Sequence, residues 1–257
     1  MAGWSAEALA SGPWVATLVA VALLTALAAV LLRIGRVPAP AEIPLAIGRA
    51  VVQLAALSLV LSGVITDGRL VALALAIMLG VAVATAARRL HAPRSAVPVL
   101  TAAIVSGPVI AMAVVFVTGA ITFSPRYVLA VGGIVIGNAM TIATLTSRLF
   151  TASVIDHWDE VEAWLSLGAT GRQAVARLAR DAVHTALVPS IDQTRTTGIV
   201  VLPGAFVGAV FGGASPLEAG RFQLVVLASI LAAGAVTGSL IAFRGHLAST
   251  RPIDHRA

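Results

Sequence analysis

Long apolar runs, separated by short polar stretches, recur along the whole chain. Each run approaches the ~20 residues that an α-helix needs to cross the hydrocarbon of a bilayer. The runs are continuous, whereas strands of an outer-membrane barrel alternate apolar and polar positions. The pattern therefore predicts an all-α, polytopic helical membrane protein. Seven spans are expected, with approximate bounds 14–32, 46–65, 70–87, 98–117, 127–145, 197–211 and 222–243.

The polar segments between these spans differ sharply in arginine content. All seventeen basic residues are arginine. Only Arg69, Arg126 and Arg221 belong to one set of alternate segments; the other set holds the remainder, including Arg251 and Arg256 in the tail. Because cytoplasmic loops carry the excess of basic residues, we expect an external N-terminus, a cytoplasmic C-terminus and a cytoplasmic segment 148–196. The first residues lack a basic n-region, so a cleaved signal peptide is not expected.

The segment 148–196 is the longest polar part of the sequence. Acidic residues precede Trp164, which suits the first turns of a helix, and Gly168 is expected to end that helix. Thr170 and Gln173 have the spacing of a capping box, which predicts a second helix. A stripe of Val175, Leu178, Ala182 and Ala186 follows it, and that helix should end at Val188, before Pro189. We expect a helix–elbow–helix along the cytoplasmic face; a helix resting on lipid headgroups is the alternative.

Composition limits the function. The chain is 59% hydrophobic and 11% charged, whereas soluble domains have about 45–50% apolar and about 25% charged residues. One transmembrane domain over 1–257 is expected. Without lysine and cysteine the chain has no P-loop lysine, Schiff-base amine or thiolate, so it is not a P-loop ATPase by itself. The net charge of +6 lies at the ends of apolar runs, which argues against nucleic-acid binding.

Glycines recur at four-residue spacing in the C-terminal half. Three such sets are Gly133 and Gly137, then Gly204, Gly208 and Gly212, and finally Gly234 and Gly238. Small residues on one face let helices approach closely in lipid. We interpret them as packing positions within the bundle, with a sliding or dimerising face as the alternative.

Few polar residues fall inside the predicted spans. Asn138, Met140 and Thr141 lie near the middle of the fifth, where Asn138 either bonds to a neighbouring helix or contacts a transported solute. No ionisable residue is expected at mid-membrane. The histidines all fall in cytoplasmic segments or the tail: His91, His157, His184, His246 and His255.

Four further sets of residues are candidates for gating or for the translocation pathway. Pro189 precedes the sixth span, and Pro203 with Gly204 predicts a kink inside it, either a moving part or a static bend. Asp192 and Arg195 are expected at its cytoplasmic mouth, either paired with each other or receiving substrate. Glu218 either caps the helix after Pro216 or meets an exiting cation.

The order of several short motifs indicates a family. Glu162-Ala163 followed by Gly168-Ala169 resembles the cytoplasmic coupling motif of ABC transporter permeases. The importer form of that motif ends in Ile-x-Leu-Pro, where this chain has Leu178-Ala179-Arg180-Asp181. Further blocks, in order, are Gly137-Asn138-Ala139-Met140, Leu167-Gly168-Ala169-Thr170, Pro189-Ser190-Ile191-Asp192-Gln193-Thr194-Arg195-Thr196-Thr197-Gly198, Leu202-Pro203-Gly204 and Phe211-Gly212-Gly213-Ala214-Ser215-Pro216-Leu217-Glu218-Ala219. Together they are similar to the FetB family of ABC permeases, which includes the plant aluminium-sensitivity permeases; Arg195 stands where that family's pattern has lysine.

The resemblance implies a permease driven by a separate cytoplasmic ATP-binding subunit, with ATP and Mg²⁺ bound there and no cofactor on this chain. The coupling residues it implies are Glu162, Ala163, Leu167, Gly168, Ala169, Thr170 and Arg172. It also implies a permease homodimer in a bacterial plasma membrane and export of iron or another metal, with a nucleotide sugar as the alternative substrate.

Two other classes of function remain to be weighed. An enzyme is not expected, because the chain lacks a His-Glu-x-x-His pair, a Gly-x-Ser-x-Gly elbow and a cysteine nucleophile. A secondary transporter would need no ATPase, but would normally carry an ionisable residue within a span. A non-transporting scaffold would leave substrate flux unchanged when the ATPase is lost.

Overall fold

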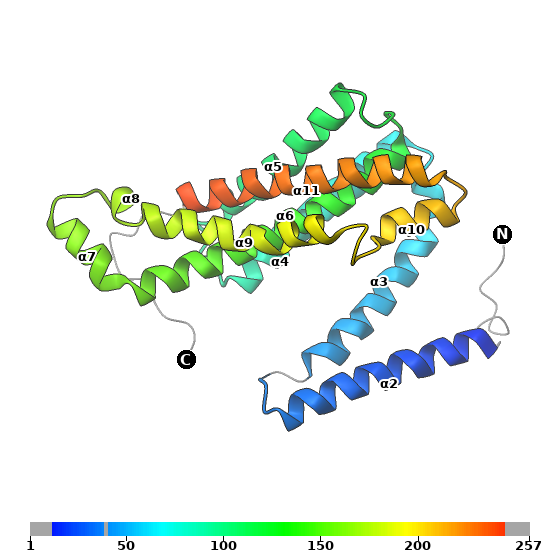
Figure 1. Ribbon diagram of the computed structural model, residues 1–257, viewed down its shortest axis with the longest axis horizontal. Coiled ribbons are helices and arrows are strands. Elements are labelled where there is room, and N and C mark those ends of the chain that lie inside the picture. Colours follow the sequence, from blue (N-terminus) through cyan, green and yellow to red (C-terminus); the bar gives the residue numbers. More distant parts are fainter. Residues whose placement is uncertain (1–11, 39–40, 245–257) are drawn as a thin grey trace. The chain divides into compact units, whose positions relative to one another are not determined.

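The computed structural model describes residues 12–38 and 41–244, where every regular element is a helix (Figure 1). The helices are α2 (Gly12–Ile34), α3 (Glu42–Val64), α4 (Gly68–Arg89), α5 (Val97–Val117), α6 (Pro125–Asp156), α7 (Trp158–Ser166), α8 (Gly171–Ala174), α9 (Ala176–Thr196), α10 (Gly204–Phe211) and α11 (Pro216–Arg244). The chain divides after Gly63 into two compact units. One permease domain over 1–257 remains a prediction.

Five described helices are long and apolar enough to cross a membrane: α2, α4, α5, α6 and α11. They contain the first, third, fourth, fifth and seventh predicted spans, so the polytopic helical fold is confirmed. The second predicted span lies in α3, a helix of 23 residues that includes Arg49 and Gln53. The tail with Arg251, Arg256, His246 and His255 lies outside the described residues, as do the first eleven positions.

The first unit contains α2 and nearly all of α3. Apolar side chains on several sides of α2 are exposed, among them Leu23, Leu24 and Leu31. A helix that is apolar all round is stable when hydrocarbon surrounds it. At 23 residues, α2 is about 34 Å long, which is enough to cross the bilayer.

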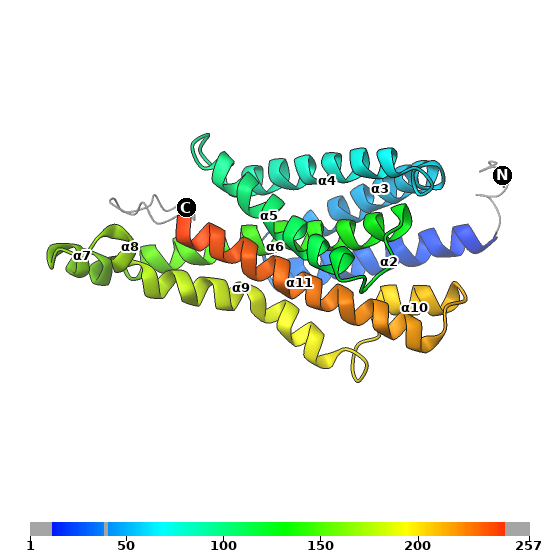
Figure 2. The same ribbon diagram turned by 90° about the horizontal axis from the view of Figure 1, so that it is seen from above.

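The second unit is a bundle built around α6, which packs against α4, α5, α9 and α11 (Figure 2). Two core clusters hold these helices together. One is formed by Ala82, Ala86, Leu100, Ala103, Ile104, Ile136, Ala143 and Ile241. The other is formed by Ala111, Val115, Ile121, Val131, Val135, Val226, Ile230 and Ala233. Six of these sixteen side chains are alanine, and small residues let helix axes approach closely in lipid.

Glycines mark the closest approaches to α11. A Cβ at Gly107 of α5 would collide with Thr237 Oγ1 and with the carbonyl of Ala233. At the same crossing Thr237 Oγ1 donates to the carbonyl of Ala103 at 3.0 Å. Gly234 lies against side chains of α6 and α9, and so does Gly238, which confirms the packing interpretation for that pair.

The other two glycine sets contain both packed and open positions. A Cβ on Gly133 would lie 3.2 Å from Met78 Cε, which is a packing position. A Cβ on Gly137, Gly204 or Gly208 would meet no atom of the described residues within 4 Å. These three positions therefore leave open faces on α6 and α10.

The fifth predicted span ends too early. The sequence places its end near 145, because polar residues and Arg148 follow, but α6 continues to Asp156 and is 32 residues long. An apolar run shows where a helix can lie in hydrocarbon and does not show where the helix ends. Phe150 and Val154 are buried on the extension, and this packing keeps it helical.

The sixth predicted span, 197–211, is wrong. Its only helix is α10, of 8 residues, which is about 12 Å long against ~30 Å of hydrocarbon. The helix that packs against α6 and α11, where the sixth span was expected, is α9. It passes through Pro189 and ends at Thr196. Pro189 and Thr185 are on its exposed side, so the carbonyl that loses its donor to proline does not face the core.

The predicted kink at Pro203 is wrong for the same reason. Pro203 is the N-cap of α10, and Gly204 is the first residue of that helix. Between α9 and α10 the backbone turns at Gly198, where φ is +86°, and Gly198 N donates to the carbonyl of Val201 at 2.8 Å. The chain therefore has a complete break between two helices instead of a bent span.

Candidate functional site

The elbow, which we define as residues 158–174, forms through local interactions. Asp159 and Glu160 occupy the first turn of α7, where the helix dipole favours acids. Gly168 has φ +88°, a left-handed conformation that costs other residues strain. The predicted capping box is confirmed, since Thr170 Oγ1 accepts from Gln173 N at 3.4 Å and Thr170 N donates to Gln173 Oε1 at 2.8 Å.

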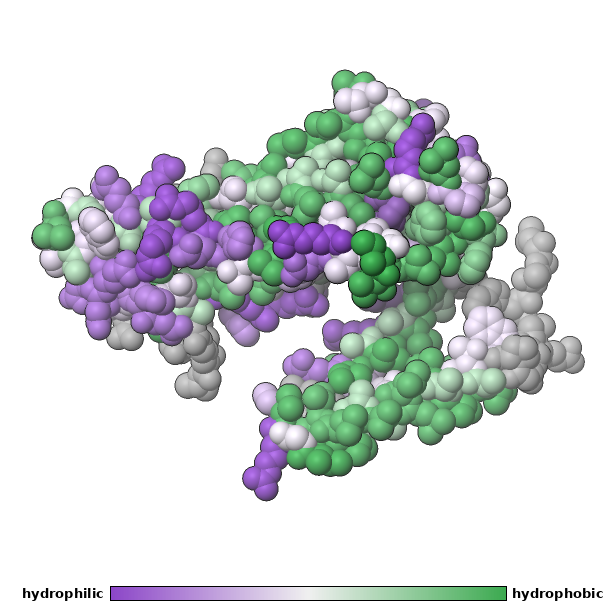
Figure 3. All heavy atoms as spheres, in the orientation of Figure 1, coloured by the Kyte–Doolittle hydropathy of each residue, from purple (hydrophilic) through white to green (hydrophobic). Residues whose placement is uncertain are grey.

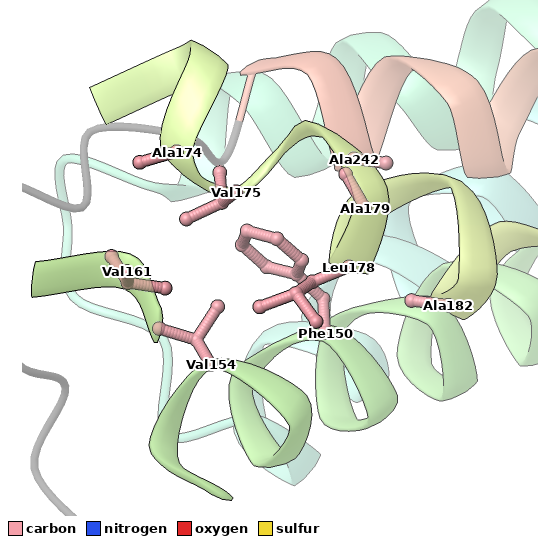
Figure 4. Close-up of a cluster of buried hydrophobic side chains, with 9 residues drawn as sticks. All are labelled: Phe150, Val154, Val161, Ala174, Val175, Leu178, Ala179, Ala182 and Ala242. Carbon is pink, nitrogen blue, oxygen red and sulfur yellow. The ribbon is translucent and has the colours of Figure 1, made fainter. Parts of the chain in front are cut away.

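An apolar cluster anchors the elbow to the bundle (Figure 4). We call it the elbow cluster; its members are Phe150, Val154, Val161, Ala174, Val175, Leu178, Ala179, Ala182 and Ala242. They come from α6, α7, α8, α9 and α11 and from the single residue between α8 and α9. Displacing the elbow would therefore disturb three long helices of the bundle at once.

Charged groups add weaker ties around this cluster. Arg177 pairs with Glu160 at 2.7 Å and with Asp181 at 3.3 Å. The hydrogen bond and charge of Glu160 raise the pKa of Arg177. All three side chains are exposed, and such pairs contribute little to stability. The guanidinium of Arg172 lies 5.9 Å from the ring centroid of Phe243, which connects α8 to α11.

The outer surface of the elbow holds the predicted coupling residues. Glu162, Ala163, Leu167, Gly168, Thr170 and Arg172 are exposed, and Ala169 is half-buried. Leu167 is 82% exposed, and Trp164, which is not among the predicted coupling residues, is 50% exposed. Hydrophilic residues gather at this end of the second unit (Figure 3). The elbow therefore presents an apolar tip, formed by Leu167 and Trp164, inside a polar surface.

Contacts with two glycines of α11 set the register of the neighbouring helices. A Cβ at Gly234 would lie 3.0 Å from Leu187, and one at Gly238 would lie 3.3 Å from Val183. Residue numbers rise along α9 as they fall along α11, so these helices are antiparallel. The second predicted helix of the segment therefore runs along the bundle and continues to Thr196, so the expected end at Val188 is wrong. Its cytoplasmic position stays a prediction.

This register puts two predicted site residues at an unexpected depth. Asp192 is about 7 Å beyond Leu187 along α9, which brings it level with Ser229, near the middle of α11. Arg195 is one turn further on, and its Nη1 lies 3.3 Å from Asp192 Oδ1. The pair therefore lies beside the middle of α11, and its place relative to the membrane stays a prediction.

The polar residues of α6 reach the same depth. Ile142 also lies against Gly234, so Asn138, one turn earlier, is nearly level with Asp192. Asn138 Nδ2 donates to the carbonyl of Ile134 at 2.9 Å, and Thr141 Oγ1 donates to that of Gly137 at 3.1 Å. Both side chains bond within their own helix. Met140 packs beside the first core cluster.

Glu218 lies at the end of the bundle opposite the elbow. Its Oε2 accepts from Ser215 Oγ at 2.9 Å and from Ser215 N at 3.2 Å. Glu218 therefore caps the start of α11, which is the first of the two roles expected for it. With Arg221 it lines a cavity of about 320 Å³. Other residues lining this cavity are Ile121, Thr122, Tyr127, Ala209, Ala214, Ala219 and Phe222.

Histidine, aspartate and glutamate are the side chains of this chain that could bind a metal ion. Within residues 12–38 and 41–244, no three histidine, aspartate or glutamate side chains are grouped closely enough to hold a metal ion.

The helical bundle and its apolar spans define a polytopic membrane protein. Residues 15–247 match the model of the Uncharacterised protein family (UPF0014). The chain belongs to this family.

Curated relatives support a role in transport. The chain is 38% identical over 202 residues to the UPF0014 membrane protein STAR2 of Oryza sativa subsp. japonica, covering 77% of this chain and 70% of that protein. It is 34% identical over 199 residues to the protein ALUMINUM SENSITIVE 3 of Arabidopsis thaliana, covering 76% and 72%. It is 36% identical over 135 residues to the probable iron export permease protein FetB of Escherichia coli, covering 52% of each chain. No solved structure matches. The resemblance to the FetB family is confirmed, and the chain is a membrane permease by family.

Proposed function

We propose that this chain is the membrane subunit of an ABC transporter and that its elbow docks on a separate ATP-binding subunit. The observation that carries the proposal is the exposed apolar tip at Leu167 and Trp164, fixed to the bundle by the elbow cluster. A docking element must be accessible and must also transmit force. The elbow meets both requirements, because α9 runs from the elbow cluster to mid-depth without a break.

The proposed assembly has two copies of this chain and two ATPase subunits in a bacterial plasma membrane, with the elbow in the cytoplasm. ATP and Mg²⁺ bind to the partner, since this chain has no lysine for a P-loop. We propose iron or another metal as the exported substrate, because a relative is named a probable iron export permease.

An ATP-independent secondary transporter is the second candidate. The observation that favours it is the charged pair at mid-depth, because ion-coupled transporters place ionisable residues there. Flux in liposomes that contain this chain alone, without ATP, would support that candidate.

A pull-down from detergent against the soluble proteome of the host tests the ABC proposal. We expect a P-loop ATPase to be recovered with the unmodified chain and lost with Leu167→Asp. Leu217→Asp is the matched control, since Leu217 is also a leucine, is 85% exposed, and lies at the opposite end of the bundle. Gly168→Trp should behave like Leu167→Asp. Recovery of the ATPase with both elbow variants would overturn the proposal.

A further inference from the structure

The exposed face of α9 differs chemically from those of its neighbours. The outward residues of α5 include Val109, Ile110 and Val114, and those of α4 include Leu73, Ile77 and Val81. Such hydrocarbon faces suit contact with lipid. From position 184 onward, the outward residues of α9 are His184, Thr185, Pro189, Asp192, Gln193 and Arg195. At 21 residues α9 is as long as α5, but it is not among the helices apolar enough to span a membrane.

The charged pair on this face is not covered by other side chains of the described bundle. The side chains of Arg195 and Asp192 are 74% and 56% exposed. Arginines near membrane surfaces extend their guanidinium groups to the headgroups. Asp192, near mid-depth, is ~15 Å from the nearest headgroups, which is beyond the reach of its short side chain. Charged residues at this depth face a bundle interior or a water-filled cavity, because hydrocarbon does not solvate them.

The neighbouring face of α6 is polar at the same depth. Thr141 and Gly137 are exposed there, and a Cβ on Gly137 would meet no described atom within 4 Å. Helices α6 and α9 pack side by side, and each carries outward positions without a hydrocarbon side chain at this level. The break between α9 and α10 begins one residue after Thr196, so the outward face of α9 ends where the backbone itself becomes irregular.

We propose that this face of α9, from Pro189 to Thr196, is the wall of a water-filled passage at mid-membrane and that the Asp192–Arg195 pair contacts a charged solute inside it. Irregular backbone at membrane depth is tolerated where it lines such a cavity, which accounts for the adjacent break. A carboxylate and a guanidinium that are already paired offer a site for an ion of either sign. The arriving ion displaces one partner and is neutralised by the other.

Cysteine labelling tests this proposal, and the chain contains no native cysteine. Gln193→Cys places a thiol beside the pair without removing either charge. Ile110→Cys is the matched control, because Ile110 is exposed one turn from Gly107, which crosses α11 beside Ala233. The probe is a charged, water-soluble methanethiosulfonate reagent applied to the chain alone in liposomes. We expect the reagent to label Gln193→Cys and not to label Ile110→Cys.

Two results would overturn the proposal of a water-filled passage. Equal protection of both thiols would place the α9 face in hydrocarbon or under another helix. A disulfide between two copies of Gln193→Cys, without labelling, would make this face a dry dimer interface. The inference deepens the proposed transport function, but the labelling needs no ATPase. It can therefore fail while the pull-down succeeds, or succeed while the pull-down fails.

Discussion

At the scale of single residues, the absence of a side chain matters most where α5 crosses α11. Gly107 lets the two backbones approach until Thr237 can donate to the carbonyl of Ala103. An interhelical hydrogen bond of this kind needs both the hydroxyl and the close approach, and it satisfies a hydroxyl that is fully buried. The crossing is therefore specified by a glycine on one helix and a threonine on the other.

Gly107→Ala should destabilise the bundle by about 1–3 kcal/mol, the usual cost of overpacking. Its Cβ would meet the Ala233 carbonyl, a backbone group that cannot rotate away. The measurement is the midpoint of thermal unfolding in detergent, followed by circular dichroism. Gly208→Ala is the control, because a Cβ there would meet no described atom within 4 Å. Equal midpoints for the two variants would contradict the prediction.

At the scale of elements, α9 is where prediction from sequence succeeded in part. The stripe of Leu178, Ala182 and Ala186 correctly indicated its buried face. The stripe did not identify the partner of that face, because a stripe cannot distinguish lipid headgroups from neighbouring helices. Hydropathy then gave the sixth span to residues 197–211, since α9 is too polar to be recognised as a membrane-depth helix.

The candidate site divides in the same way between local and distant interactions. The capping box at Thr170 depends on residues three positions apart, and the sequence predicted it. The depth of Asp192 depends on which residue of α9 lies beside Gly234, which no local pattern contains. The tie between Arg177 and Glu160 likewise joins separate helices. The sequence therefore identified the candidate side chains, but only the register between packed helices shows which of them lie at the same level of the bundle.

Leu178→Ala should weaken the link between the elbow and α9. Leu178 is buried in the elbow cluster, and the cavity left by a buried leucine costs about 2–5 kcal/mol. We expect a lower thermal midpoint and a raised rate of proteolysis within the elbow, because the elbow loses its anchor. His184→Ala, at an exposed position of the same helix, is the control. An unchanged midpoint with Leu178→Ala would show that the cluster does not anchor the elbow.

At the scale of the whole molecule, arginine separates the two ends of the bundle. Arg88, Arg89 and Arg148 lie at the elbow end, where Arg148 Nη2 donates to the carbonyl of Arg89 at 3.2 Å. The opposite end has Arg69 and Arg126 at the starts of α4 and α6. The excess of arginine at the elbow end favours its retention in the cytoplasm during insertion. A cytoplasmic elbow is also what docking on an ATPase requires.

Two single-cysteine variants test this orientation in intact cells. Ser166→Cys places a thiol at the end of α7, and Thr122→Cys places one at the opposite end of the bundle; both positions are exposed. With a membrane-impermeant maleimide, we expect Thr122→Cys to react in intact cells and Ser166→Cys to react only after lysis, since the bilayer blocks the reagent. The reverse pattern would put the elbow outside the cell, beyond the reach of any cytoplasmic ATPase. It would thereby overturn both the orientation and the docking role, whereas the expected pattern leaves the pull-down to decide whether the elbow has a partner.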